Sequence, residues 1–295
     1  WLYGSGFELV RCDGCGHRYS TSVRADAMAT KPASRRAAQS ELEQAARFDA
    51  YLELLGSNLP ARARVLDVGS NASELLALFE RHGFRAASTQ ISRPPTSLVP
   101  GRRPAAPIWQ WRLEDCLPQN ECYELVVLSH VLEYLYDPGA LLRRLRATLG
   151  PEGRVLIEVP NADDRLLSLW RGVYRPLCPG EHVSFFDATH LQQLLRRHGF
   201  GLERMIAPTR ARDLLYPSVQ SAVDAARAVV GRARTRASAP TAPPPSAASV
   251  LPKPLRAALD ACLSAIDPAV ELVCGGETSE LRGPVLIAVA RANLR

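Results

Sequence analysis

A glutamate and a histidine stand side by side at Glu181 and His182, inside the segment GEHVSFFDATHLQQLL. An imidazole titrates near neutral pH, so it can take a proton from a substrate, and a neighbouring carboxylate can orient it. The pair is therefore a candidate for proton-transfer chemistry. The structural alternative is that both side chains only fix the loop before the next helix.

A second candidate lies where the apolar segment ARVLDV runs into a turn. Asp67 and Gly69 end this segment, and the helical pattern SELLALFERHGF follows them. A strand that ends in an acidic residue and a glycine turn can bring backbone amides against a nucleoside ligand. The pattern therefore predicts a nucleoside-cofactor loop.

Two cysteines, Cys12 and Cys15, are separated by two residues in the turn CDGCGH, which is half of a tetrahedral zinc site. A complete site needs two further ligands, of which the nearby His17 could supply one. The metal prediction for this chain is therefore an incomplete site. The chain has seven cysteines, and an odd number dispersed through apolar segments fits reduced thiols better than disulfides.

The elements that must position these side chains alternate between strands and helices. Asp137 and Pro138 supply an N-cap and a first-turn proline for the helical segment GALLRRLRATL, and Gly83 supplies a helix stop. The alternation predicts an α/β fold with a parallel sheet covered by helices on both faces. Ligands of such sheets bind beyond the carboxyl ends of the strands, so DVGSN, QIS, LSHVLEY and VPN should line one rim.

Five segments follow one another along the chain. Residues 1–22 predict a small hairpin, 23–38 a connector and 39–210 the α/β core. Residues 211–254 predict a helical insertion and a Pro/Ala-rich linker. Residues 255–295 predict a helix and strands that complete the sheet, with the last two strands as a hairpin at its edge.

Composition and charge exclude several classes of partner. The 295 residues carry a formal net charge of +6, but the excess arginines lie along helix faces without interleaved aromatic residues, so a nucleic-acid partner is not favoured. No apolar stretch is long enough to cross a bilayer and the first residues lack a signal-peptide pattern, so we expect a cytoplasmic protein without a membrane partner. Because the chain begins with Trp1, we expect its natural N-terminus to lie upstream. The sequence gives no indication of oligomeric state.

The blocks VLDVGSNASELL and YELVVLSHVLEYLYDPGALLRRLRATLGPEGRVLIEVPN together resemble class I S-adenosylmethionine (SAM)-dependent methyltransferases. They are most similar to the bacterial group with VLDVG-type first loops and HVLEH-type fourth-strand loops. The resemblance covers about residues 40–210 and includes the final strand. It implies a Rossmann-like, seven-stranded sheet with helices on both faces, SAM as the cofactor and methyl transfer as the activity.

The same resemblance implies a set of cofactor-facing residues, of which three depart from the family pattern. The set is Asp67, Gly69, Asn71, Ser73, Gln90, Asp115, Ser129 and His130. Asn71 replaces a loop glycine and tolerates the left-handed conformation. Ser73 replaces another, where it either caps the following helix or crowds the cofactor. Gln90 replaces the acidic residue that holds the ribose hydroxyls, so charge-assisted hydrogen bonds are lost.

On the substrate side, GEHVSFF resembles the E-H-x-x-x-F stretch of this group, which includes sugar-modifying members with a cysteine-rich N-terminal module. It implies that His182 is the base, oriented by Glu181, and that the methyl acceptor is an oxygen or carbon atom of a small molecule or sugar. Related proteins carry another C-x-x-C upstream, which implies a structural zinc in a longer parent protein. The changes at Ser73 and Gln90 leave one alternative open: a degenerate, non-catalytic methyltransferase fold that acts as a binding partner.

Overall fold

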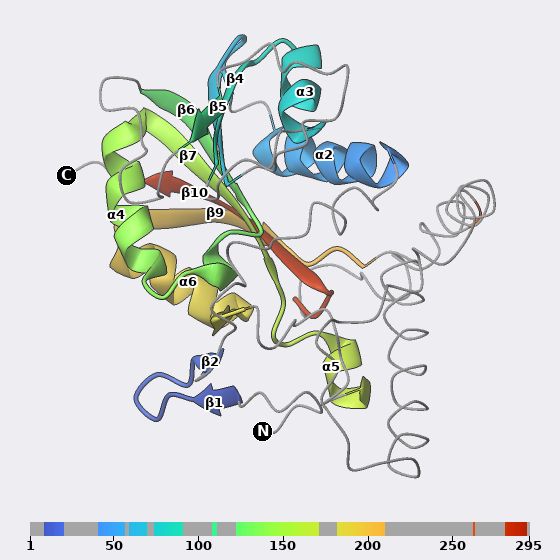
Figure 1. Cartoon of the computed structure of the whole chain (residues 1–295), viewed down its shortest axis with the longest axis vertical. Helices are drawn as coiled ribbons and strands as arrows, with labels where there is room; N and C mark the ends of the chain where they lie inside the picture. The colour runs from blue at the N-terminus through green and yellow to red at the C-terminus, as the bar shows by residue number, and fades with distance from the viewer. Residues whose placement is uncertain are drawn as a thin grey trace.

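A seven-stranded sheet forms the centre of the molecule, with the strand order β5-β4-β3-β6-β7-β10-β9 (Figure 1). The computed structural model describes residues 9–20, 41–56, 59–69, 74–90, 108–110, 122–170, 182–209, 262 and 281–293. The strands are β3 (Arg64–Val68), β4 (Arg85–Gln90), β5 (Ile108–Gln110), β6 (Tyr123–Ser129), β7 (Leu149–Pro160), β9 (Phe200–Ile206) and β10 (Val285–Ala292). Strands β3 to β7 pair in parallel, and β10 runs antiparallel to both of its neighbours.

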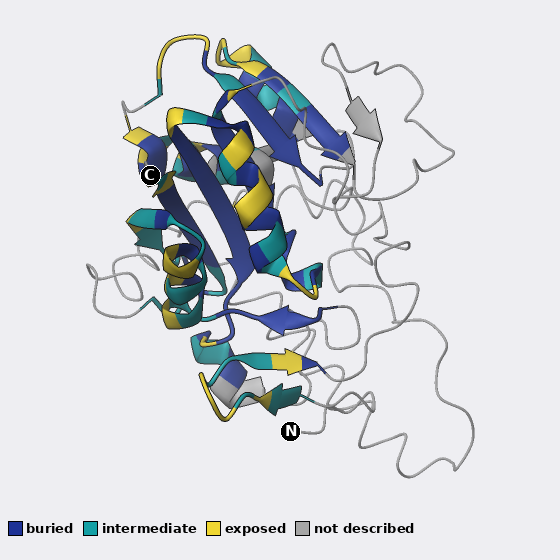
Figure 2. Cartoon of the chain, turned by 90° about the vertical axis from the view of Figure 1, so that its left-hand side faces the viewer, coloured by how far each residue is buried: buried dark blue, intermediate teal, exposed yellow. Residues whose placement is uncertain are grey.

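The central strands are buried on both faces, as their continuous apolar sequences require. Successive side chains of a strand point to opposite faces of the sheet. In β6, Val126 and Leu128 therefore join one hydrophobic cluster, whereas Leu125 and Val127 join a second cluster on the other side. In Figure 2 these strands are almost uniformly buried, and exposed positions gather on the outer sides of the helices.

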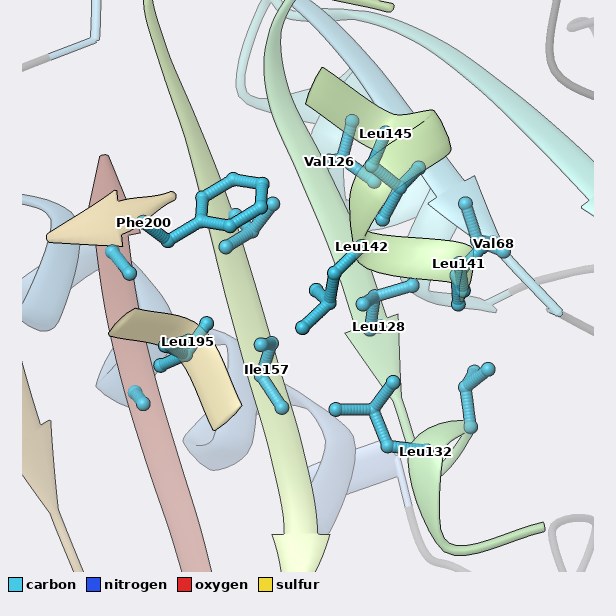
Figure 3. Packing of buried hydrophobic residues seen from close by; sticks show 14 of the residues in the cluster. Val68, Val126, Leu128, Leu132, Leu141, Leu142, Leu145, Ile157, Leu195 and Phe200 are labelled. Atoms are coloured by element: carbon cyan, nitrogen blue, oxygen red, sulfur yellow. The ribbon is translucent and has the colours of Figure 1, made fainter. Parts of the chain in front are cut away.

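Two pairs of helices cover the two faces. Helices α4 (Pro138–Thr148) and α6 (Ala188–Arg197) lie on one side in Figure 1, and α2 (Glu41–Leu55) and α3 (Glu74–Arg81) lie on the other. Figure 3 shows Leu142 of α4 and Leu195 of α6 directed at Ile157 of β7. The predicted start of α4 is confirmed, because the Asp137 carboxylate accepts a hydrogen bond from the Ala140 amide at 2.9 Å.

A second, three-stranded sheet joins the N-terminal hairpin to the rest of the protein. Strands β1 (Leu9–Arg11) and β2 (Arg18–Ser20) form the predicted hairpin, and β2 also pairs antiparallel with β8 (Ser184–Phe185). Near this sheet lie a short 3-10 helix, η2 (Leu132–Tyr134), and helix α5 (Arg165–Trp170). The pairing with β8 attaches the hairpin two residues after His182, which the sequence did not predict.

The α/β class and the seven-stranded, Rossmann-like sheet with helices on both faces are confirmed. The position of the last strand is a correction: β10 lies between β7 and β9, and β9 forms the edge. β9 carries exposed Glu203 and Arg204, whereas residues 286–290 of β10 are buried, so β9 suits the edge and β10 suits the inner position. The predicted connector at 23–38 and insertion at 211–254 lie outside the described residues. No described helix combines the length and apolar character needed to span a membrane.

Candidate functional site

The loop after β3 begins at the carboxyl rim of the sheet with two of the predicted cofactor residues. Asp67 is buried at the end of β3, and Gly69 follows with φ +81°, a left-handed conformation that favours glycine. The Gly69 amide donates to the Thr89 carbonyl at 2.8 Å, so the turn is tied to the end of β4. Asn71 and Ser73 lie outside the described residues. Gln90 ends β4, but its side chain is not described.

Three polar side chains extend the α2 face of the sheet towards this rim. Val65, Val127 and Leu156 belong to the cluster under α2, and the residues two positions further along the same strands are Asp67, Ser129 and Glu158. Since side chains alternate along a strand, all three point to the α2 side. Ser129 and Glu158 stand opposite each other in the β6–β7 register. The apolar core therefore gives way to a polar group at the carboxyl ends of the strands.

Glu158 is the centre of this group. Its Oε2 accepts hydrogen bonds from the Tyr51 hydroxyl and from Ser129 Oγ, the latter at 2.9 Å, and lies 3.6 Å from Arg47 Nη1. Burial alone would raise the pKa of Glu158, but Arg47, His130 and the two hydroxyl donors outweigh burial and lower it to about 2. Burial, followed by the Glu158 charge, raises the pKa of Tyr51 well above its ordinary value. The group therefore contains an ionised carboxylate and a protonated phenol.

His130 follows β6 in an unusual backbone conformation, with φ +53°. Its amide donates to the Glu158 carbonyl at 2.9 Å. Its ring lies between two carboxylates: Nδ1 is 3.0 Å from Glu133 Oε1, and Nε2 is 3.7 Å from Glu158 Oε1. The side chain is 27% exposed, whereas the carboxylates of Glu133 and Glu158 are buried. His130 is thus fixed at the rim with part of its ring open to solvent.

His182 lies close to the same corner. Its side chain is buried, and its ring meets the Tyr134 ring edge-on, with centroids 4.8 Å apart. The next residue, Val183, donates its amide to the Glu133 carbonyl at 2.7 Å. The structure therefore brings His182 and His130 to opposite ends of η2, although 52 residues separate them in the sequence. Glu181 and Asp115 lie outside the described residues.

The hairpin rests on the start of α6. His190 Nε2 donates to the Cys15 carbonyl at 2.8 Å, and its Nδ1 lies 2.7 Å from the Asp187 carboxylate. The His17 ring packs near the rings of Phe186 and His190, with centroids 5.2 and 5.5 Å away. Burial, followed by the charge of His190, lowers the pKa of His17 to about 4, so its ring is neutral at pH 7. These contacts dock the C-x-x-C turn a few residues from His182.

The C-x-x-C turn has features that a metal knuckle needs. The Cys15 and Gly14 amides hydrogen-bond to the Cys12 sulfur and lower the pKa of its thiol, which favours the thiolate. Gly16 has φ +82°, and its amide donates to the Cys12 carbonyl at 2.8 Å. Within the described parts of the chain, however, no three metal-ligating side chains converge. The two cysteines fit half of a zinc site.

Four members of the rim group were not predicted from the sequence: Arg47, Tyr51, Glu133 and Glu158. Glu158 left a detectable signal, because it is a lone charge inside the apolar strand VLIEV. A charge at such a position is retained only with partners. The sequence gave no signal for its partners Arg47 and Tyr51, because they lie on α2, more than 100 residues upstream.

Comparison with known proteins gives a family match and several relatives. The profile of a family described as a methyltransferase domain matches residues 38–204, more than half of the chain. The trans-aconitate 2-methyltransferase of Variovorax paradoxus is 29% identical over 180 residues, which are 58% of this chain and 67% of that protein.

Two solved structures share the fold at low sequence identity. A SAM-dependent methyltransferase of Thermotoga maritima has a TM-score of 0.53 at 11% identity, over 90% of this chain and all of that one. The 1,6-didemethyltoxoflavin-N1-methyltransferase of Burkholderia thailandensis, solved with 1,6-didemethyltoxoflavin and S-adenosylhomocysteine, has a TM-score of 0.51 at 15% identity, over 97% of this chain and all of that one.

Proposed function

The chain belongs to the methyltransferase-domain family and is a SAM-dependent methyltransferase, and we propose that it methylates an oxygen or carbon atom of a small molecule or sugar with His182 as the general base. The observation that carries the proposal is the place of His182, buried against η2 beside the carboxyl rim of the sheet. The named substrate of the 29% identical relative, trans-aconitate, supports a small-molecule acceptor.

The proposed step needs one proton acceptor and an aligned substrate. SAM supplies an electrophilic methyl group, and its sulfur keeps the electron pair of the broken carbon–sulfur bond. A bond forms from the acceptor oxygen or carbon to the methyl group, and His182 takes the proton that the acceptor loses. Glu181 orients the His182 ring.

For the cofactor we propose the residues at the rim. Asp67, Gly69, Ser129 and His130 come from the ends of β3 and β6, where ligands of such sheets bind. Asn71, Ser73, Gln90 and Asp115 complete the proposed set on the basis of the sequence resemblance.

For Cys12 and Cys15 we propose half of a structural zinc site, because the turn favours the thiolate form of Cys12. Elemental analysis of a longer parent protein that carries a further C-x-x-C, and of its Cys12→Ser variant, tests this. One equivalent of zinc is expected in the parent protein and is expected to be lost in the Cys12→Ser variant, and a metal-free parent protein would contradict the proposal.

The test of His182 separates chemistry from cofactor binding. Purified protein is assayed for S-adenosylhomocysteine release with trans-aconitate and a panel of sugar nucleotides, and SAM affinity is measured by calorimetry. His182→Ala is expected to lower kcat by roughly 10²- to 10⁴-fold, the usual contribution of a general base, with the Kd for SAM unchanged. His82→Ala, exposed at the end of α3, is the control and should keep both values. A large loss of SAM affinity in His182→Ala would move His182 to the cofactor side.

A further inference from the structure

The Glu158 carboxylate joins three segments that are distant in the sequence. Arg47 and Tyr51 reach it from successive turns of α2, Ser129 reaches it from β6, and His130 reaches it from the rim. One carboxylate therefore fixes the position of α2, of the end of β6 and of an imidazole at the same time.

The stability of the fold alone does not account for a charge at this position. Replacing a buried ion pair by apolar residues of similar volume is often neutral or stabilising, so such a pair is weak support for a purely structural role. Glu158 is surrounded by partners that keep it ionised, with a pKa near 2. These partners hold the carboxylate in a fixed place, from which it can position a neighbour at the rim.

That neighbour is His130. Its φ of +53° is a conformation that residues with a Cβ rarely adopt, and such strain gathers at functional sites. The amide and the ring of His130 both contact Glu158, and Glu133 contacts the other ring nitrogen. The ring is therefore fixed from both sides while part of it stays exposed at the rim.

We propose that Glu158 is a positioning residue for the cofactor side of the methyl-transfer site, which holds the His130 ring at the rim from its anchorage on α2 and β6. The inference rests on the proposed placement of His130 at the cofactor. It assigns to Arg47, Tyr51 and Ser129 a shared task, which is to hold the Glu158 carboxylate in place.

The test is a double-mutant cycle read out as SAM affinity by calorimetry. Glu158→Gln keeps the size of the side chain and removes its charge, and it is expected to weaken SAM binding by about tenfold, since small displacements in a site cost this much or more. His130→Ala should weaken binding at least as much. If Glu158 acts through His130, the double variant should bind no more weakly than His130→Ala alone.

A matched control comes from the same strand. Glu152→Gln removes an exposed carboxylate of β7 that pairs with Arg291 at 3.0 Å, and it should leave SAM affinity unchanged. If Glu158→Gln does not fold, Tyr51→Phe and Arg47→Gln each remove one partner of the carboxylate. Each should then weaken SAM binding in the wild type and have no effect in the His130→Ala background.

The outcomes distinguish the inference from the proposal beneath it. Unchanged affinity in His130→Ala overturns the placement of His130 at the cofactor. If His130→Ala weakens SAM binding but Glu158→Gln does not, the inference alone is overturned. The same holds if Glu158→Gln does not fold and neither fallback variant weakens SAM binding. Additive losses in the double variant also overturn it, because Glu158 would then act independently of His130.

Discussion

Gly69 and His130 both lie at the carboxyl rim in the left-handed backbone conformation, but the free-energy cost of this conformation differs between the two residues. Glycine has no Cβ, so Gly69 at φ +81° adopts it without strain. A residue with a Cβ loses roughly 1–2 kcal/mol in this region. At His130 the hydrogen bonds to Glu158 and Glu133 offset this cost. The strained backbone of His130 is therefore stabilised by hydrogen bonds to other residues of the proposed site.

A pair of glycine variants tests whether the turn after β3 serves the cofactor. Gly69→Ala and Gly83→Ala introduce a Cβ at nearly the same φ, +81° and +83°. Both should lower the free energy of unfolding by about 1–2 kcal/mol in urea titrations. Only Gly69→Ala should also weaken SAM binding, because Gly83 lies in the turn after α3, where an added Cβ meets no atom within 4 Å. Equal SAM affinity in the two variants would remove Gly69 from the cofactor loop.

The free energy of unfolding should decrease at acidic pH because of Glu158. Its pKa is about 2 in the folded protein and 4.5 ordinarily, so its ionised form stabilises the fold above about pH 4.5. This contribution, on the order of 3 kcal/mol, is lost as the pH falls from 4.5 towards 2. Urea unfolding at pH 7 and pH 3 measures it. The advantage of the wild type over Glu158→Gln should shrink at pH 3, and parallel pH profiles would contradict the assignment.

Some of the proposed site residues could be predicted from the sequence around them, and others could not. Asp67, Gly69 and His130 directly follow apolar strands, so strand prediction alone places them at the rim. Glu158 and its partner Tyr51 could not be paired from the sequence, because their contact depends on how α2 packs across the sheet, 107 residues away.

At the scale of elements, the docking of the hairpin onto β8 and α6 could not be predicted from the sequence either, because it also depends on contacts between distant segments. The hairpin itself was predictable from its turn residues, but its partner strand has only two residues, Ser184–Phe185. Such a short segment carries no periodicity that marks a strand. Further contacts span still longer separations: Arg18 donates to the Ala162 carbonyl at 2.6 Å, and His190 to the Cys15 carbonyl. The hairpin thereby becomes a neighbour of the segment that carries His182.

This docking should weaken in mild acid. The pKa of His17 is about 4 in the docked hairpin and 6.5 ordinarily, because burial, followed by His190, disfavours the charged ring. The docked form therefore keeps its full stability above about pH 6.5 and loses it as the pH falls towards 4. Hydrogen exchange of the Ser20 amide, which donates to the Val183 carbonyl at 2.9 Å, measures the docking.

In the wild type, exchange at Ser20 relative to the core strand β6 should accelerate between pH 7 and pH 5 more than in His17→Gln. The glutamine has no proton to gain in this range, so it removes only the titration. An equal response in both proteins would show that another group controls the docking.

At the scale of the whole molecule, the alternation of strands and helices predicted the fold class, and the resemblance predicted the number of strands. The order of the last strands was a different matter. β9 follows β7 through α6 and runs parallel to it, but β10 is antiparallel to both strands, so the rule that places successive parallel strands side by side does not predict that β10 lies between them. Only packing decides that β10 enters between β7 and β9. The inner position ties residues 285–292 to the same strand, β7, that carries Glu158.

Ligand linkage across the entire fold gives the broadest test, because SAM binds only the folded chain. At a SAM concentration 100 times its Kd, binding should add about 2.7 kcal/mol to the free energy of unfolding. For a domain of this size the corresponding rise in Tm is roughly 5–10 °C, measurable by calorimetric scanning. His182→Ala should keep the full rise, since it is proposed to act on the acceptor, whereas Gly69→Ala should show a smaller one. If Ser73 crowds the cofactor, Ser73→Gly should show a larger rise than the wild type at the same SAM concentration, and an equal rise would favour its role as a helix cap.

A wild type whose Tm does not respond to SAM or S-adenosylhomocysteine would mean that the changes at Ser73 and Gln90 have abolished the cofactor site.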